Sequence, residues 1–317
     1  MKKGKLVLKI LGVIFSILIL IFLYSLFIGT KGLIVKEYKI VDNKLPGDFY
    51  GLKIVHVSDI HYGFYYNSDD LKQLVDKVNK INPDIFVFTG DLIDINVNEE
   101  EEEKIIEILK EIKPNIQKYI IKGNLDYQSN NYENIVKKSD FKILDNSYDI
   151  IYSNSGNILI SGLNSNLENP NINEKLETTY TYLDENEVAY KILLMHEPDY
   201  ADKINDNTFN LILAGHSHNG QVNLPIIGAI YTPKGSKKYF ANYYQTKKGK
   251  LYISSGIGTS LIPIRLLNKP SINLYRLTNK WFKRITFNFL KSKLHNHQLY
   301  LQHYIPYYIN NYIPYYL

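Results

Sequence analysis

The sequence predicts a mixed α/β domain built in layers and preceded by one membrane-spanning helix. Three observations support this: a long uncharged apolar run lies near the N-terminus, strand-like and helix-like runs alternate after Pro46, and polar side chains follow several of the strand-like runs. Of the 317 residues, 45% are hydrophobic and 22% are charged, which is typical of a chain with a globular core. Short disulfide-rich scaffolds and disordered chains are therefore excluded.

Two features of the composition limit the possible functions. The chain has no cysteine, so disulfides, thiolate metal sites and cysteine nucleophiles are excluded, and any metal must be held by nitrogen and oxygen. The formal net charge of +5 is too small to indicate nucleic-acid binding without a basic stripe. We therefore expect no specific binding of nucleic acid.

A membrane anchor is expected over residues 10–28, after a basic segment over residues 1–9. The anchor contains no charge and is about long enough to cross a bilayer core of roughly 30 Å. Four lysines precede it and two follow it, which predicts a single-pass protein with a cytoplasmic N-terminus and an extracytoplasmic catalytic domain. A cleaved secretory signal is the alternative, but residues 25–31 lack a clean small-x-small cleavage site.

A connector over residues 29–46 leads into the predicted domain, which covers residues 47–278. Apolar side chains at helical spacing predict a helix at residues 69–79, and an acidic first turn predicts another at residues 99–113. Short apolar runs predict the strands, at residues 52–57, 85–89, 119–122, 157–161, 191–195, 211–214, 251–254 and 272–276.

Five of these strand ends are followed by carboxylate, amide or imidazole side chains. They are Asp59, His61, Asp91, Asn124, His196, His216 and His218. The carboxyl ends of strands in open α/β sheets bind ligands, because the loops there bring side chains into one crevice. Oxygen and imidazole ligands suit Mn, Fe, Zn or Ni, and seven ligands are too many for one ion. Two divalent metal ions that share one carboxylate are therefore expected.

The order of these motifs resembles that of the calcineurin-like metallophosphoesterase superfamily, over about residues 52–277. The motifs are Asp59-x-His61, Gly90-Asp91, Gly123-Asn124, His196 and Gly215-His216-x-His218. Residues 215–221 and 256–270 resemble the bacterial branch that carries an N-terminal membrane anchor or export signal. The resemblance implies a four-layer α/β/β/α sandwich of the metallo-dependent phosphatase type.

The resemblance also implies a ligand set and a reaction. One metal would be held by Asp59, His61, Asp91 and His218, and the other by Asp91, Asn124, His196 and His216, with Mn favoured. A hydroxide that bridges the two metals would then attack a phosphoester or pyrophosphate, so the protein would be a metal-dependent phosphoric ester hydrolase. Asp91, Asn124 and Asp126 are expected to be catalytic, and the substrate to be a phosphorylated small molecule or a lipid-linked one.

One motif departs from the family pattern. Where the family has Gly-Asn-His followed by an acid, this chain has Gly123-Asn124-Leu125-Asp126, so the histidine that protonates the leaving oxygen or binds phosphate is absent. General acid catalysis contributes about 10²–10⁴-fold, so the site could still act on good leaving groups. The alternative is a catalytically weakened or inactive metal-binding surface protein. His56 is expected to pack in or beside the sheet rather than to replace the missing acid.

Other polar residues near the predicted site are weaker candidates. Asn219 and Gln221 are expected to bind substrate together with Asn124, and they could orient the phosphate or a ligating imidazole. Arg265 could contact phosphate in principle, although its segment looks structural in relatives. The tail over residues 279–317 is basic and rich in tyrosine, which is consistent with a membrane-surface role or with an extension of no function. The sequence does not indicate an oligomeric state.

Overall fold

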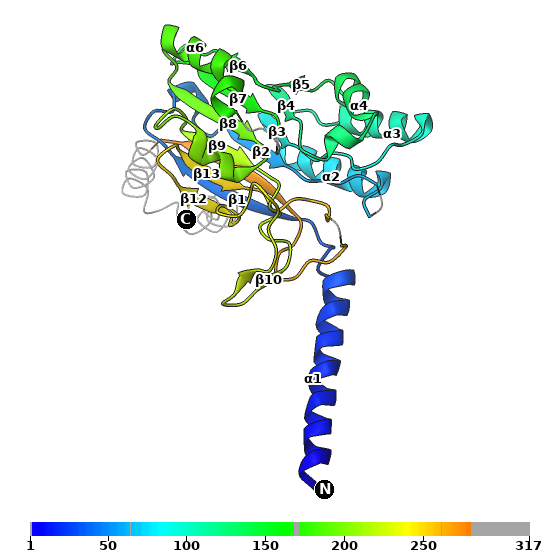
Figure 1. The fold of residues 1–317 in the computed structure, drawn as a ribbon. Coiled ribbons are helices and arrows are strands. Elements are labelled where there is room, and N and C mark those ends of the chain that lie inside the picture. The colour runs from blue at the N-terminus through cyan, green and yellow to red at the C-terminus, as the bar shows by residue number, and fades with distance from the viewer. Residues whose placement is uncertain (1, 64, 166, 168–170, 261, 280–317) are drawn as a thin grey trace, which may run out of the picture.

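The computed structural model describes residues 2–63, 65–165, 167, 171–260 and 262–279. The predicted tail therefore lies outside the described residues, apart from Asn279. A long N-terminal helix, α1 (Lys2–Phe27), projects from a layered domain, as Figure 1 shows. By length and composition, residues 3–27 could cross a membrane, and the side chains in the most apolar part of this stretch are not buried by the domain. This agrees with the expected position of the anchor.

Two six-stranded sheets form the centre of the domain (Figure 1). The strands of the first sheet are, in order, β1 (Ile34–Val41), β14 (Ser271–Thr278), β2 (Lys53–Val57), β3 (Ile85–Thr89), β4 (Gln117–Ile121) and β5 (Lys142–Ile143). The strands of the second sheet are β12 (Tyr243–Gln245), β13 (Lys250–Ile253), β9 (Leu211–Ala214), β8 (Tyr190–Met195), β7 (Ile158–Leu163) and β6 (Ser147–Ile151). A separate hairpin contains β10 (Asn223–Leu224) and β11 (Gly228–Ala229).

Helices cover the outer faces of both sheets, so the domain has the predicted four layers. The α-helices after α1 are α2 (Ser68–Ile81), α3 (Glu99–Lys110), α4 (Tyr132–Lys138), α5 (Ile172–Lys175) and α6 (Glu177–Glu185). The 3-10 helices are η1 (Gly47–Phe49), η2 (Asp126–Gln128) and η3 (Pro198–Lys203). One hydrophobic cluster joins α2, α3 and α4 to the first sheet, a second lies between the sheets, and a third joins α5 and η3 to the second sheet.

The central strands of each sheet run parallel, and this determines where the site forms. β2 pairs with β3 in register from Ile54 opposite Ile85, and β4 continues the same direction. In the second sheet β7, β8, β9 and β13 are likewise parallel. The carboxyl ends of parallel neighbours lie at one edge of a sheet, so the loops that follow them can converge.

The structure extends the sheet into the expected connector. β1 pairs with β14 in parallel from Ile34 opposite Ser271, so residues 34–41 form an edge strand rather than a simple linker. The sequence signal is weak because only Ile40 in this strand is fully buried. A half-exposed edge strand gives little of the continuous apolar pattern that marks a central strand.

Candidate metal centre

All seven predicted ligands follow the carboxyl ends of five central strands. Asp59 and His61 follow β2, Asp91 follows β3, and the remaining ligands follow β4, β8 and β9. The two sheets are joined here, because the Nδ1 atom of His196 lies 2.6 Å from the carbonyl oxygen of Thr89. The structure therefore brings ligands from both sheets to the same edge of the sandwich.

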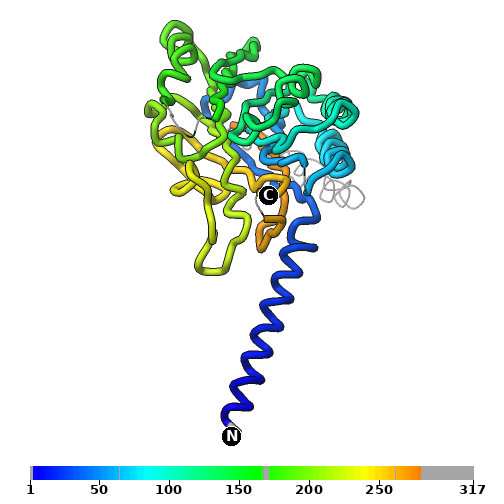
Figure 2. Tube along the Cα trace, turned by 45° about the vertical axis from the view of Figure 1, so that its right-hand side comes forward, coloured from blue at the N-terminus to red at the C-terminus, as the bar shows by residue number. Residues whose placement is uncertain are grey.

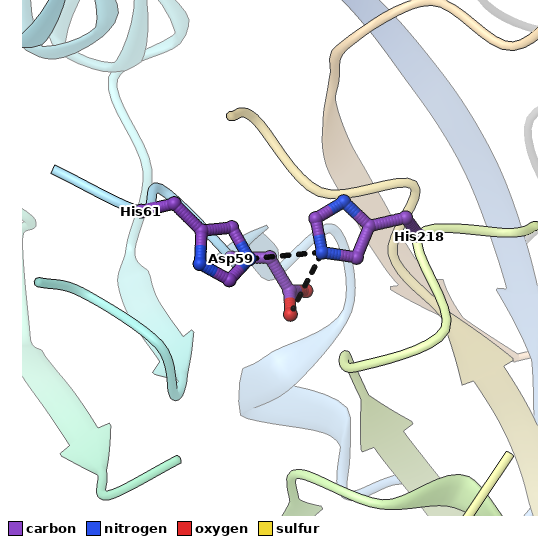
Figure 3. A group of neighbouring side chains, drawn as sticks. All are labelled: Asp59, His61 and His218. Carbon is purple, nitrogen blue, oxygen red and sulfur yellow. Dashed lines mark hydrogen bonds and ion pairs between the residues drawn. The ribbon is translucent and has the colours of Figure 1, made fainter. Parts of the chain in front are cut away.

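The first cluster consists of Asp59, His61 and His218, and Figure 3 shows the two imidazoles beside the carboxylate. The Nε2 atoms of His61 and His218 lie 2.9 Å apart, and His218 Nε2 lies 3.6 Å from Asp59 Oδ1. The Nδ1 atom of His61 lies 2.8 Å from a carboxylate oxygen of Asp94, to which it donates a hydrogen bond. Since His61 is then unprotonated at Nε2 when neutral, that nitrogen offers a lone pair to a cation.

The second cluster consists of Asp91, His196 and His216, together with the amide of Asn124. His196 Nε2 lies 3.2 Å from Asp91 Oδ2, 3.1 Å from Asn124 Oδ1 and 3.2 Å from His216 Nδ1. His216 donates from Nε2 to the carbonyl oxygen of Lys234 at 2.8 Å, so its Nδ1 atom faces the cluster. Each imidazole thus has one nitrogen held by the protein and one nitrogen directed at the site.

The backbone at the site is held in an unfavourable conformation. Asp59, His61, Asp91, His216 and His218 all have φ between 47° and 65°, in the left-handed region. Non-glycine residues rarely adopt this region, and such residues cluster at functional sites where the surrounding structure supports them. Five of the seven predicted ligands therefore share a conformation that packing alone would not select.

Close backbone contacts require glycine between the two loops that carry Asp91 and Asn124. A Cβ atom on Gly123 would lie 2.3 Å from the backbone nitrogen of Asp91, and one on Gly90 would lie 2.6 Å from His196 Nδ1. Gly90 also has φ of 92°. The glycines of the second and third motifs thus let the strand ends approach closely enough for their side chains to meet.

The charges at the centre are strongly coupled. Burial alone would raise the pKa of Asp91, but the imidazoles of His196 and His61 lower it below its usual value. Burial, followed by the neighbouring charge of His196, lowers the pKa of His216 to about 4. Burial and then His61 likewise lower the pKa of His218 well below its usual value. Burial would lower the pKa of His196, but the carboxylate of Asp91 raises it well above its usual value, and Asp94 likewise raises the pKa of His61. These two imidazoles therefore favour their protonated form beside the carboxylates, and binding a metal would release their protons.

This donor set fits two divalent cations. Each cluster combines one carboxylate with two imidazoles, and the atoms offered as ligands within each cluster lie within 4.8 Å of one another. In the first cluster, two imidazole nitrogens and a carboxylate lie close together and are buried. A cation bound between these three groups would stabilise this arrangement. Asp91 belongs to the second cluster by distance, and its expected bridging role remains a prediction.

Asp126, expected to be catalytic, is instead used to hold the backbone. Its Oδ2 atom accepts from the N–H groups of Asp91 and Gly123, and its Oδ1 atom accepts from those of Leu92 and Ile93. The side chain is fully buried beneath the loops. Because both oxygens already accept two backbone hydrogen bonds, the geometry makes Asp126 a positioning residue rather than a group that exchanges a proton with substrate.

Besides Asn124, the residues expected to bind substrate are Gln221 and Asn219, and these two have different surroundings. Gln221 donates from Nε2 to the carbonyl oxygens of Ile262 and Ile264, both at 2.9 Å, and accepts from the N–H of Ser260. The amide of Gln221 is therefore used to hold the loop over residues 260–264, and it does not face a phosphate position. Asn219 is buried, and its Oδ1 atom, which is itself buried, has no hydrogen-bond partner among the described residues.

Two further residues have structural surroundings, as the sequence suggested. His56 is buried in β2 between the hydroxyls of Thr89, at 2.8 Å, and Tyr275, at 3.2 Å. Arg265 is also buried and donates to the carbonyl oxygen of Ser255 at 2.8 Å. The Nη2 atom of Arg265 lies 3.3 Å from His218 Nδ1, so the guanidinium contacts a predicted metal ligand and does not reach solvent.

Sequence reasoning missed the groups that orient the ligands. Asp94 follows the second motif by three residues and could have been noticed as an acid near His61. The carbonyl oxygens of Thr89 and Lys234 carry no signal in the sequence, because every residue has a carbonyl. Such partners fix the ring orientation of a ligating histidine, and their identity depends on the fold.

Comparisons with known proteins agree with this site. A sequence profile of the calcineurin-like phosphoesterases matches residues 52–220. The uncharacterized metallophosphoesterase YkuE of Bacillus subtilis is 35% identical over 246 residues, which are 76% of this chain and 84% of that protein. The UDP-2,3-diacylglucosamine pyrophosphatase LpxG of Chlamydia trachomatis is 24% identical over 287 residues, covering 73% of this chain and 86% of LpxG.

A shorter match and a solved structure complete the comparison. The phosphodiesterase YaeI of Escherichia coli is 31% identical over 87 residues, 27% of this chain and 32% of YaeI. The NAD nucleotidase of Haemophilus influenzae has a TM-score of 0.47 at 14% identity, and the match covers 65% of this chain and 45% of that structure. On the profile match and the similarity to YkuE, the chain belongs to the calcineurin-like phosphoesterase family.

Proposed function

We propose that this protein is a membrane-anchored phosphohydrolase that uses two divalent metal ions to cleave a phosphoester or pyrophosphate bond. The observation that supports this most directly is the pair of adjacent ligand clusters at the carboxyl ends of five strands. Family membership supports the reaction class, and the names of LpxG and YaeI include a pyrophosphatase and a phosphodiesterase.

Each of the two clusters would bind one cation. Asp59, His61 and His218 would hold one cation, and His196 and His216 with Asn124 would hold the other. Asp91 would contact both cations, as the family resemblance implies. Its Oδ2 atom lies 3.2 Å from His196 Nε2, and its Oδ1 atom accepts from the Leu125 N–H at 2.8 Å, so the carboxylate is held in place at the site. Two bound cations, with Mn favoured, would activate a water nucleophile and neutralise charge on the phosphoryl oxygens.

The substrate would lie against Asn124 and Asn219. Asn124 is half-buried beside His196, and the buried Oδ1 atom of Asn219 lacks a hydrogen-bond partner among the described residues, which leaves its acceptor capacity unused. We propose a phosphorylated small molecule or a lipid-linked phosphate as the substrate class. A pyrophosphate or another bond with a good leaving group is favoured, since Leu125 replaces the general acid and His56 is enclosed in the sheet.

Hydrolysis of bis-p-nitrophenyl phosphate by the full chain in detergent with Mn²⁺ tests the proposal. Wild type is compared with Asp91→Asn, with Leu125→His, and with Asp140→Asn as a control that makes the same chemical change on an exposed side chain. We expect turnover that requires metal, is retained in Asp140→Asn, disappears in Asp91→Asn and increases in Leu125→His. Stoichiometric metal binding without turnover in any of these proteins would favour the catalytically inactive metal-binding protein.

We also propose that α1 spans the membrane once, with the N-terminus in the cytoplasm and the catalytic domain outside. The four lysines among the first nine residues support this orientation. Because the chain has no cysteine, single cysteines introduced as Lys5→Cys and Tyr152→Cys report the two sides. A membrane-impermeant maleimide should label only Tyr152→Cys in intact cells, and the opposite labelling would refute the orientation.

A further inference from the structure

One face of the domain, next to the end of α1, exposes an unusual set of apolar side chains. We define the membrane face as Ile226, Ile227, Ile230, Tyr231, Ile262 and Leu267, whose exposed fractions range from 56% for Ile262 to 107% for Ile226. Among the described residues outside α1 and Ile28, every large aliphatic side chain that is more than half exposed belongs to this face. Such a concentration marks an interaction surface, since scattered single exposures need no explanation.

The membrane face lies on the side of the domain from which α1 leaves. In Figure 1 the hairpin of β10 and α1 project from the domain in the same direction, and Figure 2 shows the same relation after rotation. The tip of the hairpin is level with the end of α1 that joins the domain in both views. If α1 spans a bilayer, that end lies at the membrane surface, because an apolar helix of about 20 residues matches the hydrocarbon thickness.

Hydrogen bonds connect α1, the loop over residues 256–270 and the hairpin into one unit. The backbone N–H of Arg265 donates to the carbonyl oxygen of Ser25 at 2.9 Å, and a Cβ atom on Gly29 would overlap the Arg265 carbonyl. Gln221 binds the carbonyl oxygens of Ile262 and Ile264, and the Asn223 N–H donates to the carbonyl oxygen of Leu266 at 3.0 Å. The hairpin is therefore held at a defined height relative to the anchor.

The charges around the membrane face suit anionic lipid headgroups. Residues 219–241 and 256–270, which carry the face, contain no aspartate or glutamate. Lys234, Lys237 and Lys269 are exposed in these segments, and Lys31 is exposed just after α1. Apolar side chains bordered by lysine are typical of surfaces that enter the boundary between headgroups and acyl chains.

We propose that the membrane face inserts into the surface of the same bilayer that α1 crosses, with Ile226 and Ile227 at the boundary of the acyl chains. The domain is then held at the membrane at two points, the anchor and the hairpin, instead of swinging on a single tether. The hairpin also follows His218 along the chain after a few residues, so this contact would set the orientation of the metal centre relative to the lipid surface. The proposal rests on α1 as a membrane span and does not depend on hydrolysis.

The test uses the full chain with one introduced cysteine at a time, labelled with the polarity-sensitive fluorophore NBD. Ile227→Cys reports the hairpin tip, and Ser16→Cys reports the middle of α1. Tyr152→Cys is an exposed control that directly follows β6, the strand that Figure 1 shows at the end of the domain away from α1. The proteins are reconstituted in vesicles of phosphatidylcholine and phosphatidylglycerol, either without nitroxide, with a nitroxide near the top of the acyl chains to test Ile227→Cys, or with a nitroxide near the terminal methyl groups to test Ser16→Cys at the bilayer centre. We expect blue-shifted, strongly quenched emission at Ile227→Cys and neither effect at Tyr152→Cys.

Each outcome decides a different point. Quenching at Ser16→Cys without quenching at Ile227→Cys would refute the inserted hairpin while leaving the anchor in place, and no quenching at Ser16→Cys would refute the anchor and the proposal together. A blue shift at Ile227→Cys without lipid quenching would mean that protein, such as a second copy, covers the face. Ile226→Ser with Ile230→Ser in the Ile227→Cys chain should reduce the quenching severalfold, and unchanged quenching would contradict insertion driven by the apolar side chains.

Discussion

Replacing Asp126 by asparagine should destabilise the fold strongly, although the change removes only one oxygen. The Oδ2 atom accepts from the N–H groups of Asp91, at 2.9 Å, and Gly123, at 2.8 Å, and Oδ1 accepts from those of Leu92 and Ile93. An asparagine side chain can keep only one oxygen, so its NH₂ group would face two N–H donors. Hydrogen bonds to a charged group contribute about 1.5–3 kcal/mol each, so losing two should cost about 3–6 kcal/mol.

Urea unfolding followed by far-UV circular dichroism of the full chain in detergent measures this loss. Burial and the neighbouring carboxylate of Asp91 raise the pKa of Asp126 to about 7, so the measurement belongs at about pH 8, where the carboxylate is ionised. Asp140→Asn makes the same chemical change on an exposed side chain and should shift the free energy of unfolding by about 0.5 kcal/mol or less. If the two variants are equally stable, the assigned positioning role of Asp126 is wrong.

Three further predictions follow from single contacts. Asp94→Asn should weaken Mn²⁺ binding in titration calorimetry by about 10–100-fold, because the Asp94 carboxylate orients the His61 ring. An unchanged affinity would exclude that role. Burial lowers the pKa of His56 to about 3 from 6.5, so the unfolded chain binds more protons between these values and stability falls as the pH falls. In wild type, His56 should therefore lower the free energy of unfolding by about 2–3 kcal/mol between pH 6.5 and about pH 4.5, and His56→Gln should lack this decrease in urea unfolding. An equal decrease in wild type and variant would contradict this. Gly123→Ala should abolish tight Mn²⁺ binding, since its Cβ atom would lie 2.3 Å from the Asp91 nitrogen, and retained affinity would show that the loops can separate cheaply.

The parts of the fold that the sequence predicted well are those with strong local patterns. β3 and β9 begin and end where their apolar runs do, and both are fully buried. The structure also adds elements that the pattern did not indicate, including β1, β6 and α4. Every residue of β6 is only half-buried, and α4 is seven residues long, so neither shows a sustained hydrophobic period.

The sequence by itself determined the family, the apolar span and the set of candidate ligands. It could do so because each ligand directly follows a strand, so its position along the chain is enough to place it at the sheet edge. Only the tertiary structure decided that Asp126 holds backbone amides, that Asp94 orients His61, and that Gln221 braces a loop. Apart from the local bond between Gly123 and Asp126, these roles depend on hydrogen bonds between residues more than thirty positions apart, for which local residue patterns carry no signal.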